Sequence, residues 1–374
     1  MEKIPVFAPT IGEDTKQHIN DALDVGWLGM GATTQEFEKR ISDYLKLKDR
    51  YAVVTNTGTS ALHIALLTAG VGPGDEVITP SFSYVADHQA ILMTGAQVVM
   101  CDIRDDNLGI DCDKAEQLIT ENTKAIIPLH FAGIPCDQKG IYNLAKKYNL
   151  RIIEDAMHAF GTTIDDRKIG SYGDITCFSF DPVKIITSID GGCVIVNSKE
   201  DRERLHNLRL LGVNKDTTER YKNKRAWDYD VVSEGFRYHL TNIMASVGIS
   251  QIKKLDEFIQ SRKYVCQKYN KSFEKISDLK TPQTDFKNIS PFIYSLRVQN
   301  GKRESLIKHL NDLDIDVGIH FIPVHKHSYF KDSRIGDMKV TEKVTNEVLT
   351  LPLHSNMDSE FVDRVIHGVT SFFD

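Results

Sequence analysis

Short apolar runs alternate with helix-like stretches from residue 50 to residue 200, and this alternation is the strongest constraint on the fold. Helical spacing is found in ALHIALLTAG, YVADHQAILMTG, DKAEQLITE and KGIYNLAKKYN. The apolar runs have the length and the Ile, Val and Phe content of strands: YAVVTN, DEVITPSF, AQVVMCDI, KAIIPLH, RIIEDA, ITCFSF and CVIVNS. Strand, helix and strand in repetition predict an α/β protein, with a mostly parallel central sheet sandwiched by helices.

The chain of 374 residues is long enough for two domains of ~150 residues each. We place the boundary near residue 245, so that residues 1–245 form a large α/β domain and residues 246–374 a smaller α+β domain. A helix is predicted to begin at Thr241 or Asn242, either of which can cap it. The second domain contains the strand candidate FIYSLRV, the helix RESLIKHLNDL and the strand-like run DVGIHFIPV. The polar residues 213–234 predict a long loop, a type that is usually functional or mobile.

Charge and composition exclude several kinds of partner. The net charge of −6 argues against nucleic acid as a main partner. The cysteines form no CxxC pair, so we expect no metal site. No apolar run approaches the ~18 residues that a membrane span needs, and the N-terminus lacks the pattern of a signal peptide. We therefore expect a cytoplasmic protein with no membrane partner.

Lys184 lies in a short loop between the strand candidates ITCFSF and CVIV. An ammonium group beside a buried sheet is costly to desolvate. Some enzymes solve this problem by making the lysine amine a Schiff base with pyridoxal phosphate. A lysine that faces solvent from a hairpin explains this segment equally well.

Polar residues gather at the carboxyl ends of the predicted strands, where sheets of this kind bind ligands. After the first strand, TNTGTSALHIAL opens a helix. The backbone N–H groups that begin at Gly58, together with the hydroxyls of Thr59 and Ser60, can hold a phosphate there. An ordinary capped turn explains this motif at least as well. Other strand ends carry Asp102, His130 and Asp155.

Four more residues near these ends have a possible role beside a planar, phosphorylated cofactor. Asp155 can keep a pyridine nitrogen protonated, or can cap the next segment. His158 can reach a hydroxyl on the ring, or can be structural. Tyr84 can stack on the ring, although an aromatic residue here is more often core. Ser179 can donate a hydrogen bond to a phosphate oxygen.

Several motifs occur in a fixed order along nearly the whole chain: GWLGMG with FEK, GTSAL, VGPGDEVITPSFSYVA, GAQVVMCDI, IIEDAMHAFG, GSYGDITCFSF, an SFxxxK lysine with a following GG, ASVGISQIKKLD, HFIPVH and LPLH. In this order they resemble the DegT/StrS-type sugar aminotransferases. The resemblance implies a pyridoxal 5'-phosphate enzyme of the aspartate aminotransferase fold (type I). It also implies transfer of an amino group, usually from glutamate, to a keto group of a nucleotide-linked sugar, by a homodimer with shared active sites. The product is then an amino sugar for a surface polysaccharide or a glycoconjugate.

The resemblance also implies roles by position. Lys184 is the Schiff-base lysine, Asp155 pairs with the pyridine nitrogen, His158 contacts the ring hydroxyl and Tyr84 stacks on the ring. The phosphate is held by Gly58, Thr59, Ser60 and Ser179.

This chain departs from the family pattern at three places. Asp190 stands where the family usually has Glu, and Arg237 stands where an Asn usually reaches the phosphate of the neighbouring subunit. Arg237 can still bind that phosphate. Asp181 replaces a frequent His, and we assign it to the sugar together with His325. These departures leave open a second interpretation, a catalytically reduced or regulatory relative with the same fold.

Overall fold

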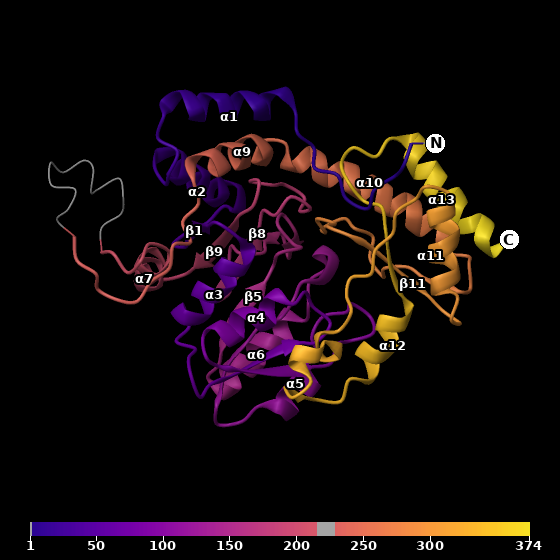
Figure 1. The fold of residues 1–374 in the computed structure, drawn as a ribbon. Helices are drawn as coiled ribbons and strands as arrows, with labels where there is room; N and C mark the ends of the chain where they lie inside the picture. The colour runs from indigo at the N-terminus through magenta and orange to yellow at the C-terminus, as the bar shows by residue number, and fades with distance from the viewer. Residues whose placement is uncertain (1, 215–228) are drawn as a thin grey trace.

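The computed structural model describes residues 2–214 and 229–374. The middle of the loop predicted over residues 213–234 lies outside this part of the chain. The ends of that loop are described, and Val213 pairs with Val231 in an antiparallel bridge. Both termini lie at the same end of the molecule (Figure 1).

Within the described residues, an eight-stranded sheet lies at the centre of the molecule, in the order β1-β9-β8-β5-β4-β2-β3-β12. Strand β9 runs antiparallel to β1 and β8, and the other neighbours are parallel. The predicted α/β class and the strands predicted between residues 51 and 198 are confirmed. The strands span Tyr51–Thr55 (β1), Glu76–Pro80 (β2), Gln97–Cys101 (β3), Thr123–Ile126 (β4), Arg151–Asp155 (β5), Ile175–Ser179 (β8), Gly192–Val196 (β9) and Arg334–Ile335 (β12).

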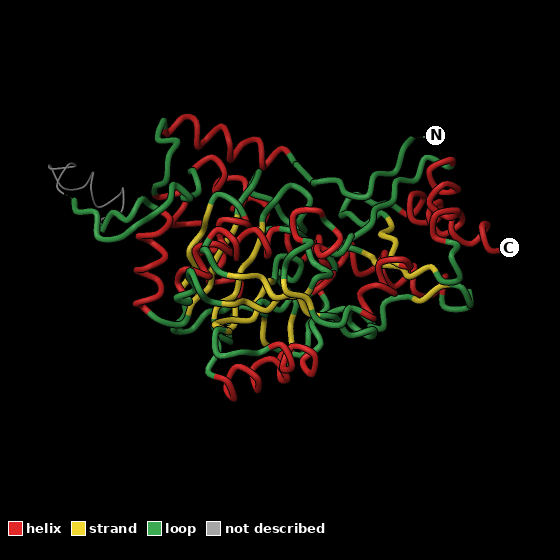
Figure 2. Tube along the Cα trace, turned by 60° about the horizontal axis from the view of Figure 1, so that its bottom comes forward, coloured by secondary structure: helices red, strands yellow, loops and turns green. Residues whose placement is uncertain are grey.

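Helices cover both faces of this sheet, which explains why its strands are apolar along their whole length. Every residue of β2, β8 and β9 is buried. One face packs against α3, α4 and α7, and the other against α5 and α6. Figure 2 shows the strands gathered between layers of helix. These helices span Gly58–Thr68 (α3), Ala86–Met93 (α4), Cys112–Leu118 (α5), Gln138–Tyr148 (α6) and Lys199–Arg209 (α7).

The helix predicted from Thr241 begins where the sequence indicates, but two helices follow instead of one. Thr241 caps α9 (Asn242–Ile252) by accepting a hydrogen bond from the N–H of Met244 at 3.3 Å. The chain leaves helical geometry at Lys254, with φ −105° and ψ 0°, and resumes as α10 (Leu255–Phe273). The Lys254 side chain pairs with Asp14 at 2.5 Å. Asp14 belongs to α1 (Glu13–Val25), which packs with α2 (Ala32–Leu45) against α9.

The C-terminal part of the chain has its own small antiparallel sheet and its own apolar core. FIYSLRV forms β11 (Tyr294–Val298), as predicted. The run DVGIHFIPV is not a strand, because only Gly318 pairs, in a single bridge with Thr350. Pro323 has no N–H to give to a ladder. The remaining elements are β10 (Leu279–Lys280), α11 (Arg303–Asp312), α12 (Lys339–Glu347), β13 (Val348–Leu351) and α13 (Ser359–Phe373).

The domain boundary stays a prediction. Residue 245 lies inside α9, while the separate C-terminal core is formed by α10, α11, α13 and the strands between them. Short elements complete the fold: β6 (Thr163–Ile164), β7 (Arg167–Lys168) and the 3₁₀ turns η1 (Phe131–Gly133), η2 (Val324–Lys326) and η3 (Ser328–Phe330). Among residues 2–214 and 229–374, no helix is both long and apolar enough to span a bilayer.

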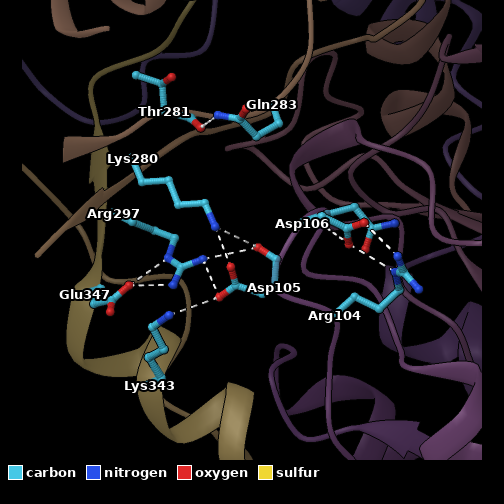
Figure 3. Close-up of polar contacts among 10 residues, drawn as sticks. Arg104, Asp105, Asp106, Lys280, Thr281, Gln283, Arg297, Lys343 and Glu347 are labelled. Atoms are coloured by element: carbon cyan, nitrogen blue, oxygen red, sulfur yellow. Dashed lines mark hydrogen bonds and ion pairs between the residues drawn. The ribbon is translucent and has the colours of Figure 1, made fainter. Parts of the chain in front are cut away.

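An ion cluster joins the large sheet to the C-terminal sheet (Figure 3). Its centre is Asp105, in the loop after β3, which contacts Lys280, Arg297 and Lys343. Arg297 is buried, and it binds Asp105 at 2.9 Å and Glu347 at 2.5 Å. Burial alone would raise the pKa of Asp105, but the hydrogen bonds from Lys280 and Arg297 lower it to about 2. Asp105 is therefore ionised at neutral pH.

Arg297→Met is expected to lower the free energy of unfolding by about 3 kcal/mol, because it leaves two carboxylates without their buried cation. Arg104→Met is the matched control, because Arg104 pairs with Asp106 at 2.7 Å on the surface and should contribute less than ~1 kcal/mol. Urea unfolding measures both losses, and equal losses would contradict the prediction. The folded-state pKa of Asp105 is depressed, so its contribution is present at neutral pH and is lost as the pH falls toward 2.

Candidate active site

A cavity of about 600 Å³ opens at the carboxyl ends of β1, β5 and β8. A second cavity, beside the ion cluster, holds only about 30 Å³, which leaves room for little more than water. The larger cavity brings together most of the residues that the sequence singles out. Its lining includes Gly58, Thr59, Tyr84, Asp155, His158, Ser179, Asp181, Lys184 and Asp190.

Lys184 projects into this cavity from the loop that joins β8 to β9. The loop turns at Asp181, whose carbonyl accepts the N–H of Lys184 at 3.0 Å. The side chain is partly buried, with Nζ 4.2 Å from the centre of the Phe292 ring. Burial lowers the pKa of Lys184 to about 8, although Asp155, Asp181 and Asp87 oppose the shift. A substantial fraction of the amine is therefore neutral near physiological pH and can act as a nucleophile.

Asp155 ends β5 and faces the same cavity. Its Oδ1 accepts a hydrogen bond from the N–H of Met157 at 2.9 Å, and the residue is only 4% exposed. Burial raises the pKa of Asp155, whereas the Met157 N–H and the charge of Lys184 lower it. The preceding residue, Glu154, points to the opposite face, where it binds His130 at 2.8 Å. Of these two adjacent carboxylates, only that of Asp155 therefore faces the cavity.

The start of helix α3 supplies an anion-binding corner of the cavity. The first N–H groups of a helix have no partner within the helix and carry partial positive charge. Gly58 keeps this corner open, because a Cβ there would lie 3.0 Å from Ser179 Oγ and from Met157 Sδ. The N–H of Asp181 donates to Ser179 Oγ at 3.3 Å, which leaves the hydroxyl proton of Ser179 free to donate. This corner fits a phosphate.

His158 lies beside this cavity as a neutral imidazole. Its Nδ1 accepts the N–H of Ala132 at 3.3 Å, so its proton is on Nε2. Burial and the positive charges of Lys184 and His320 hold the pKa of His158 well below its usual value. The ring lies 4.4 Å from that of Phe292. His158 can therefore donate one hydrogen bond to an oxygen on a bound ring.

The structure does not bring Ser60, His325 or Arg237 into this cavity. The Ser60 hydroxyl belongs to a capping box with Thr57, with bonds of 2.9 and 3.1 Å. Both ring nitrogens of His325 have partners, Ser81 at 2.7 Å and Glu342 at 2.9 Å. Arg237 is exposed outside the cavity. Their predicted roles stay predictions.

Sequence reasoning missed several residues of the site. Phe7, Phe292, His320 and Phe321 line the cavity from segments far away in the chain. His320 and Phe321 belong to the HFIPVH motif, which therefore carried a usable signal. Phe7 and Phe292 have no local signal, since only tertiary packing places them here. Asp87, on α4, was also missed; it is buried, and its charge opposes the lowering of the pKa of Lys184.

Known proteins resemble this chain along nearly its whole length. The spore coat polysaccharide biosynthesis protein SpsC of Bacillus subtilis is 35% identical over 375 residues, which cover 98% of this chain and 96% of SpsC. The GDP-perosamine synthase of Caulobacter vibrioides is 34% identical over 372 residues, which cover 98% and 97%.

A solved structure has the same fold. Spr1654 of Streptococcus pneumoniae, described as a sugar aminotransferase, matches in its PMP-form with a TM-score of 0.91 and 31% identity, over 98% of each chain. It has also been solved in a PLP-form. Residues 9–370 match the model of one family. The chain therefore belongs to the DegT/DnrJ/EryC1/StrS aminotransferase family.

Proposed function

We propose that this aminotransferase moves an amino group from glutamate to the keto group of a nucleotide-linked keto-deoxysugar, in the biosynthesis of an amino sugar for a surface polysaccharide or a glycoconjugate. One observation carries the proposal: Lys184, Asp155 and the anion-binding start of α3 surround a single cavity. The relatives in polysaccharide and perosamine synthesis support the sugar as acceptor. The six cysteines, all in the described part of the chain, are free thiols, which supports a reducing compartment such as the cytoplasm.

The cofactor is pyridoxal 5'-phosphate, which supplies an electron sink for the substrate carbon that loses its proton. The residues present fit each part of it. Lys184 would form the covalent attachment, Asp155 would accept the hydrogen bond of the pyridinium, and His158 would donate from Nε2 to the ring oxygen. The start of α3 and Ser179 hold the phosphate. Tyr84 is the candidate for stacking on the ring.

Proton movement falls to Lys184. With the cofactor bound, Lys184 would be the group that takes a proton from the substrate carbon and returns it, and its lowered pKa would suit both transfers near neutral pH. Phe7, Phe292 and Phe321 form an apolar wall on this side, and they reduce the access of water to the reacting atoms. Amination of the sugar reverses these steps.

A single-turnover experiment tests the proposed function. Glutamate is added to the cofactor-loaded enzyme, and 2-oxoglutarate is measured together with visible absorbance. We expect one 2-oxoglutarate per site and conversion to the pyridoxamine form. Nucleotide-linked 3-keto and 4-keto deoxysugars are then added separately, and the aminated product is identified by mass spectrometry. A cofactor-loaded protein that yields no 2-oxoglutarate is instead the regulatory relative.

The pH dependence of cofactor attachment follows from the lowered pKa of Lys184. Only the neutral amine attacks the cofactor aldehyde, so the attachment rate should rise with pH and level off above about 8. Below that value the rate should change about tenfold per pH unit. Stopped-flow absorbance measures the rate. A plateau that is reached only near pH 10.5, as for an ordinary lysine, would contradict the prediction.

A homodimer completes the proposed site. Tyr84 lines the cavity but is 61% exposed, and Ile189 and Val231 are exposed by 47% and 60%. Exposed apolar side chains of this kind are covered in many assemblies by a second subunit. We place Arg237 at this interface, directed to the phosphate of the neighbouring site. Light scattering during turnover measures the molecular mass of the active enzyme. A monomer with full activity would contradict the proposed dimer.

A further inference from the structure

Ser81, His325 and Glu342 form a line of hydrogen bonds beside the active site. Nδ1 of His325 lies 2.7 Å from the hydroxyl oxygen of Ser81, and Nε2 lies 2.9 Å from the carboxylate of Glu342. The three residues come from the loop after β2, from η2 and from α12. A serine, a histidine and a carboxylate joined in this order are also the parts of a hydrolase triad.

The burial of Ser81 excludes the role of a triad nucleophile. The residue is 0% exposed, and it lies outside the lining of the active-site cavity. Its oxygen also accepts the backbone N–H of His325 at 3.2 Å. A nucleophile must reach the atom that it attacks, and this hydroxyl has no surface at which a substrate could meet it. The line of bonds therefore holds parts of the chain together.

The partners of His325 decide where its ring proton lies. A carboxylate can only accept a hydrogen bond, so Nε2 carries the proton and donates it to Glu342. Lys326 donates to the other oxygen of this carboxylate at 2.6 Å. The Ser81 oxygen already accepts the N–H of His325, so the hydroxyl proton of Ser81 is free to bond to Nδ1. The imidazole thus links Ser81 to Glu342 and uses both of its nitrogens.

This link joins two segments that both line the cavity. The cavity lining includes close chain neighbours of Ser81 and of His325, namely Ser83, Tyr84, His320 and Phe321. The rings of Tyr84 and Phe321 lie 6.1 Å apart. The backbone adds a further bond between the segments, from the N–H of Val324 to the carbonyl of Ser81 at 2.9 Å. Tyr84 is 61% exposed, so the place of its ring depends on how firmly its loop is held.

We propose that His325 is a positioning residue. Its bond to Ser81 fixes the loop of residues 81–84 against the segment of residues 320–325, and this holds Tyr84 in place to stack on the cofactor ring. The stacking role of Tyr84 rests on the proposed function. Glu342 serves the imidazole by fixing which nitrogen carries the proton. His325 acts through Tyr84, because its own side chain does not line the cavity.

Two substitutions separate the two bonds of His325. His325→Asn places an amide oxygen near the position of Nδ1, so it keeps a partner for Ser81 and loses Glu342. His325→Gln places an amide N–H near the position of Nε2, so it keeps Glu342 and loses Ser81. Titration with pyridoxal phosphate, followed by visible absorbance, should show apparent affinity about tenfold weaker for His325→Gln. His325→Asn should stay within about threefold of wild type. Equal losses, or no loss in either variant, would overturn the proposal.

A double-variant cycle tests whether His325 acts through Tyr84. Tyr84→Ala should weaken cofactor binding by itself, and it should cause little further loss when His325→Gln is already present. The visible circular dichroism of the bound cofactor, which depends on the stacking around its ring, should fall in both single variants and remain in His325→Asn. Losses of affinity that simply add would place the effect of His325 elsewhere and overturn the proposal.

Two control variants separate this effect from a general loss of stability. His327→Gln changes an exposed histidine two residues further along the same segment. Glu154→Gln disturbs a buried residue that binds His130 on the side of β5 away from the cavity. Both variants should keep the cofactor affinity and the dichroism, even where Glu154→Gln lowers the melting temperature. A loss of dichroism in Glu154→Gln as large as that in His325→Gln would overturn the proposal.

Hydrogen exchange in the cofactor-free, full-length protein tests the contact between the segments directly. The N–H groups of Val324 and His325 both bond to Ser81. Peptides that contain them should exchange faster in His325→Gln than in His325→Asn, and equal exchange would overturn the proposal. None of these readouts uses glutamate or a sugar, so a failure of the proposed amino transfer would be seen separately. If exchange differs as expected but Tyr84→Ala binds the cofactor like wild type, the contact is supported and the stacking role of Tyr84 is overturned.

Discussion

Lys184→Ala is expected to lower kcat by at least ~10⁴-fold, because one substitution removes both the covalent attachment of the cofactor and the group that moves the proton. The visible absorbance of the attached cofactor should disappear as well. Steady-state assays with glutamate and an accepted keto sugar measure the first effect, and a spectrum of the purified protein measures the second.

Lys168→Ala is the matched control for this experiment. Lys168 is another partly buried lysine, whose pKa burial also lowers, but it lies over the Tyr44 ring at 3.2 Å and outside the cavity. Its loss should leave the cofactor spectrum unchanged. If Lys184→Ala kept a turnover within tenfold of wild type, the lysine could not have its proposed role. Partial recovery with a small added amine would show that proton transfer, rather than folding, was lost.

Asp155→Asn is expected to lower kcat by about 10²–10³-fold, the usual loss when one preorganised group that stabilises transition-state charge is removed. An amide cannot hold a proton on the pyridine nitrogen, and the cofactor then becomes a poor electron sink. The rate of the glutamate half-reaction measures this loss without requiring the sugar.

Glu154→Gln provides the comparison for Asp155→Asn. Glu154 adjoins Asp155 on β5 but binds His130, Gln138 and Tyr142 on the opposite side of the strand. Its substitution should lower the melting temperature and leave the half-reaction within a few-fold of wild type. Similar rates in the two variants would argue that burial at this strand end, rather than the charge facing the cavity, sustains catalysis.

Much of the fold could be predicted from the sequence, because the strands of the large sheet are buried on both faces and read as continuous apolar runs. The errors lie where tertiary contacts decide the outcome. The run from 316 to 324 is apolar enough for a strand, yet His320 and Phe321 line the cavity instead. At the break before α10, Lys254 pairs with Asp14, 240 residues earlier in the chain, a contact that local sequence does not reveal.

The residues of the candidate site also fall into two groups: those that the sequence predicts and those that only the folded structure reveals. Lys184, Asp155 and Gly58 follow strand ends, so the topology of a parallel sheet already brings them together. The Ser60 hydroxyl lies in a capping box with Thr57, and its predicted phosphate role stays a prediction, because a helix cap and a phosphate site use the same residue types.

The cavity wall has a consequence for synthesis. Phe7 stacks on Phe292 at 5.6 Å, and Phe321 completes the same wall, so a segment near the beginning of the chain and segments of its C-terminal part together line one cavity. A chain still on the ribosome has its lysine and aspartate long before it has this wall. A product truncated before Phe292 therefore contains Lys184 and Asp155 but lacks two of the three phenylalanine side chains of this wall.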